Sequence, residues 1–139
     1  MSVNKERVAL LVAALRSGRY AQGRGALKRQ RPDDRYCCLG VACVVAAENG
    51  LQLRTENFVN AVKFGDPGDF AADASWSILP SSVRDWFGFV LGDPILTGED
   101  GRNKGAAVWN DDYARDFAWI ADAFERTFLT DTPNQEVPS

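Results

Sequence analysis

Apolar residues recur at helical spacing near both ends of the chain. They stand every three or four positions over residues 8–15, and Ser17-Gly18 follows as a stop signal. The same spacing returns over residues 116–129, where Phe117, Ile120 and Phe124 share one face. Because such spacing places apolar side chains on one side of a helix, both segments are predicted to be amphipathic helices that pack on a core.

Two further helices are predicted between these segments. Residues 38–48 are almost wholly apolar and are followed by an Asn-Gly pair, a pattern typical of a buried helix with a C-terminal stop. Val44 and Val45 leave a buried strand as the alternative, because β-branched residues lower helix propensity. Residues 79–88 have a proline near the first helical position and a glycine at the end, which predicts a short capped helix.

Turn signals between short arms predict two β-hairpins. The first has arms near residues 26–30 and 35–37 on either side of a Pro-Asp-Asp turn. The second has arms at residues 95–97 and 106–108, and Asp100-Gly101 stands in the turn between them.

The stretch between the helices predicted at residues 38–48 and 79–88 carries weaker signals. Residues 55–62 are predicted to form a short helix with Thr55 as its N-cap, because three apolar residues share a face. Residues 63–75 are rich in Gly, Asp and Pro, so they are predicted to form a loop that lies over the core through Phe64 and Phe70.

These elements predict an α+β fold with a single small domain of four to five helices and one or two short β-hairpins. A chain of 139 residues, 45% of them apolar, is long enough to bury a core without disulfides or metals. The domain is expected to span residues 1–130. The remaining residues, 131–139, are polar and include two prolines, so they are expected to form a frayed tail.

The absence of histidine narrows the possible chemistry. Without an imidazole the chain cannot build a Ser-His-Asp or Cys-His nucleophile pair or a histidine metal site. Its three cysteines, Cys37, Cys38 and Cys43, do not have a usual zinc-ligand spacing, and an odd set with two adjacent members does not suggest a disulfide framework. We therefore expect reduced thiols, no metal and no cofactor.

The amino-terminal sequence favours a cytoplasmic protein. Its apolar stretch covers only residues 8–15, which is too short to span a bilayer, and no small-residue cleavage pattern follows it. We expect no membrane association.

Charge is distributed unevenly along the chain. Residues 16–35 hold seven basic and two acidic residues, a net charge of +5, so the rest of the chain carries −8. Such asymmetry can steer an anionic ligand or an acidic protein surface, although exposed hairpins are often charged without any such role. Nucleic acid is a less favoured partner, because the pI is about 4.9. The residues predicted to bind are Arg19, Tyr20, Gln22, Gly23, Arg24, Gly25 and Arg29.

Two other groups of residues have both a structural and a chemical interpretation. Asn110 and Asp111 precede the last predicted helix, where short polar side chains commonly cap; they are also candidate binding residues, and Asp111 with Asp112 is a candidate acid-base or Mg²⁺ pair. Cys37 and Cys38 stand where a strand meets a helix, where a thiol can be reactive, but their apolar neighbours favour packing.

Five motifs follow one another along the chain. They are Ser17-Gly18-x-Tyr20-x-Gln22-Gly23-x-Gly25-x-Leu27, Tyr36-Cys37-Cys38-Leu39-Gly40-Val41-x-Cys43, Leu79-Pro80-x-x-Val83-x-x-Trp86, Asn110-Asp111 and Phe117-x-x-Ile120-Ala121-Asp122-x-x-Glu125. Together they resemble the motifs of a small, uncharacterised accessory protein family of tailed bacteriophages. Where that family shows Leu-Asn-Asp-x-Gly-x-Ser-Phe, residues 109–117 of this chain lack the Gly and the Ser.

The resemblance implies a protein made in the cytoplasm of an infected bacterium, and it brings no activity with it. Our first hypothesis is a non-catalytic protein that binds a host protein, for host takeover or against a defence system, through the basic hairpin and exposed aromatics. The alternative is a nucleotide- or phosphate-binding protein that uses the Gly-rich loop. An enzyme based on the cysteines or on the aspartate pair is the least favoured hypothesis. The oligomeric state is left open.

Overall fold

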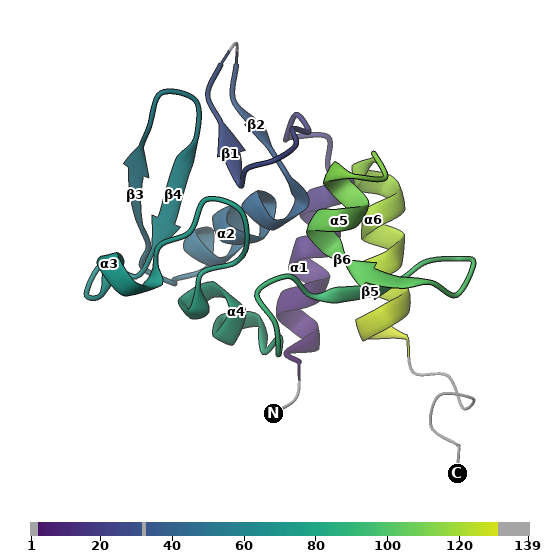
Figure 1. The fold of residues 1–139 in the computed structure, drawn as a ribbon. Coiled ribbons are helices and arrows are strands. Elements are labelled where there is room, and N and C mark those ends of the chain that lie inside the picture. Colours follow the sequence, from purple (N-terminus) through teal and green to yellow (C-terminus); the bar gives the residue numbers. More distant parts are fainter. Residues whose placement is uncertain (1–2, 32, 131–139) are drawn as a thin grey trace.

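The computed structural model describes residues 3–31 and 33–130 and has six α-helices and three antiparallel two-stranded hairpins in these ranges (Figure 1). The helices are α1 (Lys5–Arg16), α2 (Cys38–Glu48), α3 (Phe70–Asp73), α4 (Ser81–Phe87), α5 (Ala106–Asp111) and α6 (Phe117–Phe124), which continues into a π-helical turn, η1 (Glu125–Leu129). The strands are β1 (Lys28–Arg29) with β2 (Arg35–Tyr36), β3 (Arg54–Asn57) with β4 (Val62–Gly65), and β5 (Ile95–Thr97) with β6 (Asn103–Gly105).

The core lies between the helices. α1 packs against α2 and α6, and α4 and α5 pack against α2. α1 begins at the N-cap Asn4, whose side chain accepts a hydrogen bond from the Arg7 backbone N–H. Only the apolar stripe of α1 is buried. In contrast, α2 is buried over most of its length, because nearly all its residues are apolar. The predicted helices at the two ends and at residues 38–48 are therefore confirmed, and α4 confirms the predicted short helix.

The first hairpin is held tightly against α2. A Cβ atom at Gly40 would overlap the backbone carbonyl of Leu27, so only glycine allows the helix to approach this closely. The Cys37 backbone N–H also donates to the Leu27 carbonyl, over 3.2 Å. In Figure 1 the β1–β2 and β3–β4 hairpins rise side by side above α2. A hydrogen bond from Arg31 Nε to the Val59 carbonyl, 3.2 Å, joins them.

The structure corrects the prediction for residues 55–75. Residues 55–62 do not form a helix, because β3 pairs antiparallel with β4, with Thr55 opposite Phe64. Val62 and Phe64 alternate inward along β4, whereas Val59 lies in the turn between the strands and is 82% exposed. The predicted loop over residues 63–75 likewise contains most of β4 and the short helix α3.

The second predicted hairpin is present, but its second arm is misplaced. The strand that pairs with β5 is β6, and residues 106–108 form the first turn of α5. The Ala107 backbone N–H in that turn donates to Asp93 Oδ1 over 2.8 Å, which satisfies one of the unpaired amides at the start of the helix.

The α+β class and the single small domain are confirmed. Six helices and three hairpins exceed the predicted four to five and one or two, because α3 and α5 are too short to give a periodic signal and β3 and β4 were assigned otherwise. The predicted helix over residues 116–129 is α6 followed by the π-helical turn. The predicted tail at residues 131–139 lies outside the described residues.

Candidate functional site

Asn110 is at the centre of the predicted binding residues and is completely buried. It lies in α5, and its side-chain amide makes four hydrogen bonds, which is the maximum for this group. Its Oδ1 accepts from Gln22 Nε2 at 2.8 Å and from the Cys38 backbone N–H at 3.3 Å. Its Nδ2 donates to the Gly23 carbonyl at 2.9 Å and to Asp111 Oδ1 at 2.7 Å.

The loop before β1 is tied to α5 by further bonds around this amide. Gln22 Nε2 also donates to the Arg115 carbonyl at 2.7 Å, and Arg24 Nε donates to the Asn110 carbonyl at 3.1 Å. We call the group formed by Gln22, Gly23, Arg24, Asn110 and Asp111 the polar junction. It connects the loop, the start of α2 and α5, three segments that are distant in sequence.

The remaining predicted site residues contact other parts of the chain. Arg19 forms an ion pair with Glu48 of α2 at 3.5 Å, and its guanidinium lies over the Tyr20 ring. Tyr20 packs edge to face on Tyr36 with ring centroids 5.4 Å apart, and burial raises the pKa of its hydroxyl.

Gly25 and Arg29 stabilise the conformation of the loop before β1. Gly25 has φ +83°, a left-handed conformation that favours glycine. Arg29 Nε donates to the Arg24 carbonyl over 2.7 Å. The structure thus brings Gln22, Gly23, Arg24, Asn110 and Asp111 together as internal partners, and it directs Arg19 and Arg29 toward groups of the same chain. Such an arrangement stabilises the fold.

Two residues between α5 and α6 occupy structural positions. Ala114 has φ +52°, the left-handed conformation in which a glycine would be unstrained. Asp116 is the N-cap of α6 and accepts from the Trp119 backbone N–H at 2.9 Å, which a serine would also do. Both residues therefore shape the connection between α5 and α6.

The three cysteines are buried thiols. Cys37 is 1% exposed, and Cys38 and Cys43 are fully buried. Burial raises the pKa of the Cys37 thiol to about 12 and raises the pKa of the other two well above the ordinary value. Because the thiolate is the reactive form, this environment favours packing over nucleophilic chemistry.

Within residues 3–31 and 33–130, no group of three or more acidic or cysteine side chains is placed to hold a metal ion. No helix in the described part of the chain is long and apolar enough to cross a membrane.

Exposed aromatic residues gather beside the β3–β4 hairpin. Phe58 is 40% exposed and Trp76 is 45% exposed, and their rings meet edge to face with centroids 5.4 Å apart. Lys63 Nζ lies 5.4 Å and 5.1 Å from these two ring centroids, within the range of cation–π attraction. We call Phe58, Val59, Lys63 and Trp76 the hairpin face.

A polar groove of about 440 Å³ borders the hairpin face. Lys63 lies in both. Arg54 also lines the groove, with its guanidinium over the Phe70 ring at 4.5 Å. Lys63 therefore joins the two rings of the hairpin face to a groove that also contains Glu56, which forms an ion pair with Arg54 at 3.5 Å. Sequence reasoning missed the hairpin face because Phe58 and Val59 were assigned to a helix face; the polar residues on either side of this short apolar pair were the available sign of a hairpin turn.

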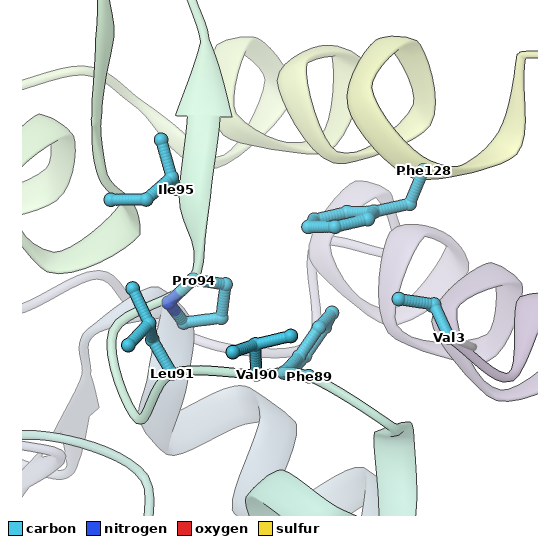
Figure 2. Close-up of a pocket in the computed structure, with 7 residues that line it drawn as sticks. All are labelled: Val3, Phe89, Val90, Leu91, Pro94, Ile95 and Phe128. Atoms are coloured by element: carbon cyan, nitrogen blue, oxygen red, sulfur yellow. The ribbon is translucent and has the colours of Figure 1, made fainter. Parts of the chain in front are cut away.

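A second exposed surface is wholly apolar. A groove of about 190 Å³ lies between the loop that joins α4 to β5 and the end of the π-helical turn (Figure 2). Val90 and Leu91 on its rim are 81% and 51% exposed. The groove is lined by Val3, Phe89, Val90, Leu91, Pro94, Ile95 and Phe128.

Residues 3–128 match the model of a family described as a domain of unknown function, DUF8296. The chain belongs to the DUF8296 family. The matched residues run from just before α1 into the π-helical turn, so the polar junction, the hairpin face and the apolar groove all lie within the DUF8296 domain. No curated protein and no solved structure matches the chain.

Proposed function

We propose that this protein is a bacteriophage accessory protein that acts in the host cytoplasm by binding a host protein, without catalysis. The motifs that resemble those of phage proteins support a bacteriophage origin. The DUF8296 family has no described activity that would argue against a binding role. The hairpin face is the observation that carries the binding proposal. Exposed aromatic residues grouped around a cation are typical of residues that anchor protein interfaces.

The hairpin face suits a partner with an acidic surface and an apolar residue at its centre. Lys63 places a positive charge beside both rings, and Arg31 lies beside the Val59 turn, whereas Arg54 in the groove is paired with Glu56. The neighbouring β1–β2 hairpin belongs to the basic segment 16–35, whose net charge is +5, although Lys28 and Arg35 in it form ion pairs with Asp34 and Asp33. Complementary charge would raise the association rate, and burial of Trp76 and Phe58 would provide affinity.

The geometry favours this proposal over phosphate binding at the Gly-rich loop. A phosphate cradle requires donors directed at the ligand, whereas the amides of Gln22 and Asn110 are bonded to each other and to the backbone. An enzyme based on the cysteines is less favoured still, because the raised pKa of Cys37 keeps its thiol protonated near neutral pH.

The test is capture from a lysate of a candidate bacterial host by the immobilised chain. Trp76→Ala and Val59→Asp should each weaken retention of the captured protein by about 30-fold or more, the size of an interface anchor. Val90→Asp is the matched control, because Val90 and Val59 are exposed to 81% and 82%. Val59→Asp should change the free energy of unfolding by less than about 0.5 kcal/mol, since the side chain makes few contacts in the folded chain.

Retention that survives both hairpin-face substitutions would contradict the assignment of this surface. Retention that is abolished by nuclease treatment would assign the bound partner to nucleic acid instead of protein. Loss of retention in Arg19→Glu/Arg24→Glu alone, with the hairpin-face variants unaffected, would move the contact to the loop before β1.

A further inference from the structure

Two arginines face each other across the β1–β2 hairpin. Arg29 and Arg35 are register partners in the antiparallel pair, so their side chains leave the same face of the hairpin. Like charges placed directly opposite each other destabilise a strand pair. A negatively charged group bound between two such side chains removes this cost, because it replaces a repulsion by two attractions.

The loop before β1 holds both guanidinium groups in place on this face. The loop pairs with β2 through two backbone hydrogen bonds, so β2 lies between the loop and β1 (Figure 1). Arg35 Nη1 donates to the Gln22 carbonyl at 3.4 Å. Arg29 Nε crosses β2 to donate to the Arg24 carbonyl at 2.7 Å. Both guanidinium groups therefore lie over one short stretch of backbone.

A third guanidinium group belongs to the same loop. Arg24 Nε donates to the Asn110 carbonyl at 3.1 Å, which leaves the outer end of the side chain free to bond elsewhere. Gly25, the next residue, gives Arg29 its room, because a Cβ atom there would lie 2.8 Å from Arg29 Nη2. Backbone carbonyls thus anchor Arg24 and Arg29 by their Nε atoms and leave their terminal nitrogens available.

These three side chains have an excess of positive charge. Among the residues that the structure describes, no carboxylate forms an ion pair with Arg24 or Arg29, and no group accepts from their terminal nitrogens. Arg35 pairs with the exposed Asp33 at 3.0 Å, whereas Asp111 Oδ1 accepts from the amide of the polar junction. Three guanidinium groups and one carboxylate leave a net charge of +2. The arginine cluster is our name for Arg24, Arg29 and Arg35.

We infer that the arginine cluster binds the dianion of a phosphate monoester. Such a group carries about −1.5 to −2 at pH 7, which matches the charge of the cluster, whereas a carboxylate would leave half of that charge unbalanced. Its oxygens also accept paired N–H bonds from guanidinium groups. The site differs from a cradle of backbone amides, because the Gly23 N–H donates within the fold to the Tyr36 carbonyl.

The test is titration of the full chain with inorganic phosphate near neutral pH at constant ionic strength, followed by the Nε–Hε NMR signals of Arg24 and Arg29. The signals should move to a saturating value. Arg29→Gln and Arg35→Gln should each raise the dissociation constant about 10-fold, because each removes charge-assisted hydrogen bonds. Arg31→Gln is the matched control, since Arg31 lies on the same hairpin and donates to the distant Val59 carbonyl. It should change the dissociation constant less than about twofold.

Asp33→Asn supplies a result that loss of folding cannot imitate. It removes the carboxylate that competes for Arg35, so it should lower the dissociation constant about threefold. Three results would each overturn the inference: a wild type without a saturating shift, equal effects of Arg29→Gln and Arg31→Gln, and equal affinity for acetate and phosphate.

Further ligands distinguish the sources of the phosphate group. Tighter binding of glycerol phosphate than of inorganic phosphate would support the site and assign it to a free phosphorylated metabolite. Tighter binding of a phosphoserine peptide would support it and assign it to a modified protein. Duplex DNA that displaces inorganic phosphate more effectively than either would overturn the monoester in favour of a phosphodiester backbone. Failure here leaves the proposed hairpin-face contact standing, because none of these variants alters that face.

Discussion

The polar junction and the hairpin face differ in almost every physical respect. The junction is buried, is centred on the fully buried Asn110 and joins three distant segments by hydrogen bonds. The hairpin face is exposed and consists of Phe58, Val59 and Lys63 on the β3–β4 hairpin and of Trp76 in the segment after α3. The sequence motifs select the first region and omit the second.

This difference shows what a motif of Gly, Asn, Gln and Cys can mean. A buried amide with four partners and a glycine that touches a carbonyl admit few substitutes, because each alternative leaves a buried group unpaired or causes an overlap. Exposed aromatic residues meet no such constraint from the fold. Motif residues that look chemical can therefore be fold determinants, while the proposed contact surface carries no motif.

The largest expected effect would test whether the junction is structural. Asn110→Ala should lower the free energy of unfolding by about 3 kcal/mol, because it leaves the Cys38 N–H and the Gly23 carbonyl buried without their partner. Urea unfolding measures the loss, and Asn60→Ala at an exposed turn is the control, with a change below about 0.5 kcal/mol. A loss below about 1 kcal/mol for Asn110→Ala would contradict the structural role of the polar junction.

A smaller effect concerns the cysteine that precedes α2 beside the junction. The folded-state pKa of Cys37 is raised to about 12 from 9.0, so its contribution to stability is intact below pH 9.0 and is lost as the pH rises toward about 12. Between neutral pH and about pH 10.5, wild type should lose about 2 kcal/mol more unfolding free energy than Cys37→Ala. Equal pH dependence of the two chains would show that this thiol ionises in the folded state.

The smallest expected effect is a gain. Ala114 has φ +52° and precedes Arg115, whose carbonyl accepts from Gln22 at the junction. Ala114→Gly should raise the free energy of unfolding by about 1 kcal/mol, because glycine adopts this conformation without strain. Ala118→Gly in α6 is the matched control, and it should lower stability by about 1 kcal/mol in thermal unfolding. Destabilisation by both substitutions would show that Ala114 is not strained.

The helices were predictable from the sequence to the extent that their signals are local. The stripe of α1, the apolar run of α2 and the glycine that ends α4 each lie within one short window. β3 lacked such a signal because all four of its residues are exposed and polar, so no alternation marks a buried face. Its position depends on pairing with β4, which is an interaction across a turn.

For the candidate site, the sequence indicated the correct residues at the junction and could not assign their role. Gln22 and Asn110 are 88 positions apart, and a hydrogen bond of 2.8 Å between them depends on the docking of α5 onto α2 and the loop before β1. The hairpin face was not predictable, since the exposure of Trp76 and Phe58 depends on the pairing of Ser75, after α3, with Phe64 of β4.

By itself, the sequence determined the α+β class, four of the helices, the absence of imidazole chemistry and the uneven charge, because composition and helical periodicity are local properties. Only the tertiary structure decided which polar residues are buried, which aromatics are exposed and where the apolar groove forms. The physical reason is that burial is a property of contacts between distant segments: the same asparagine is a ligand-binding group on a surface and a fold determinant when three segments close around it.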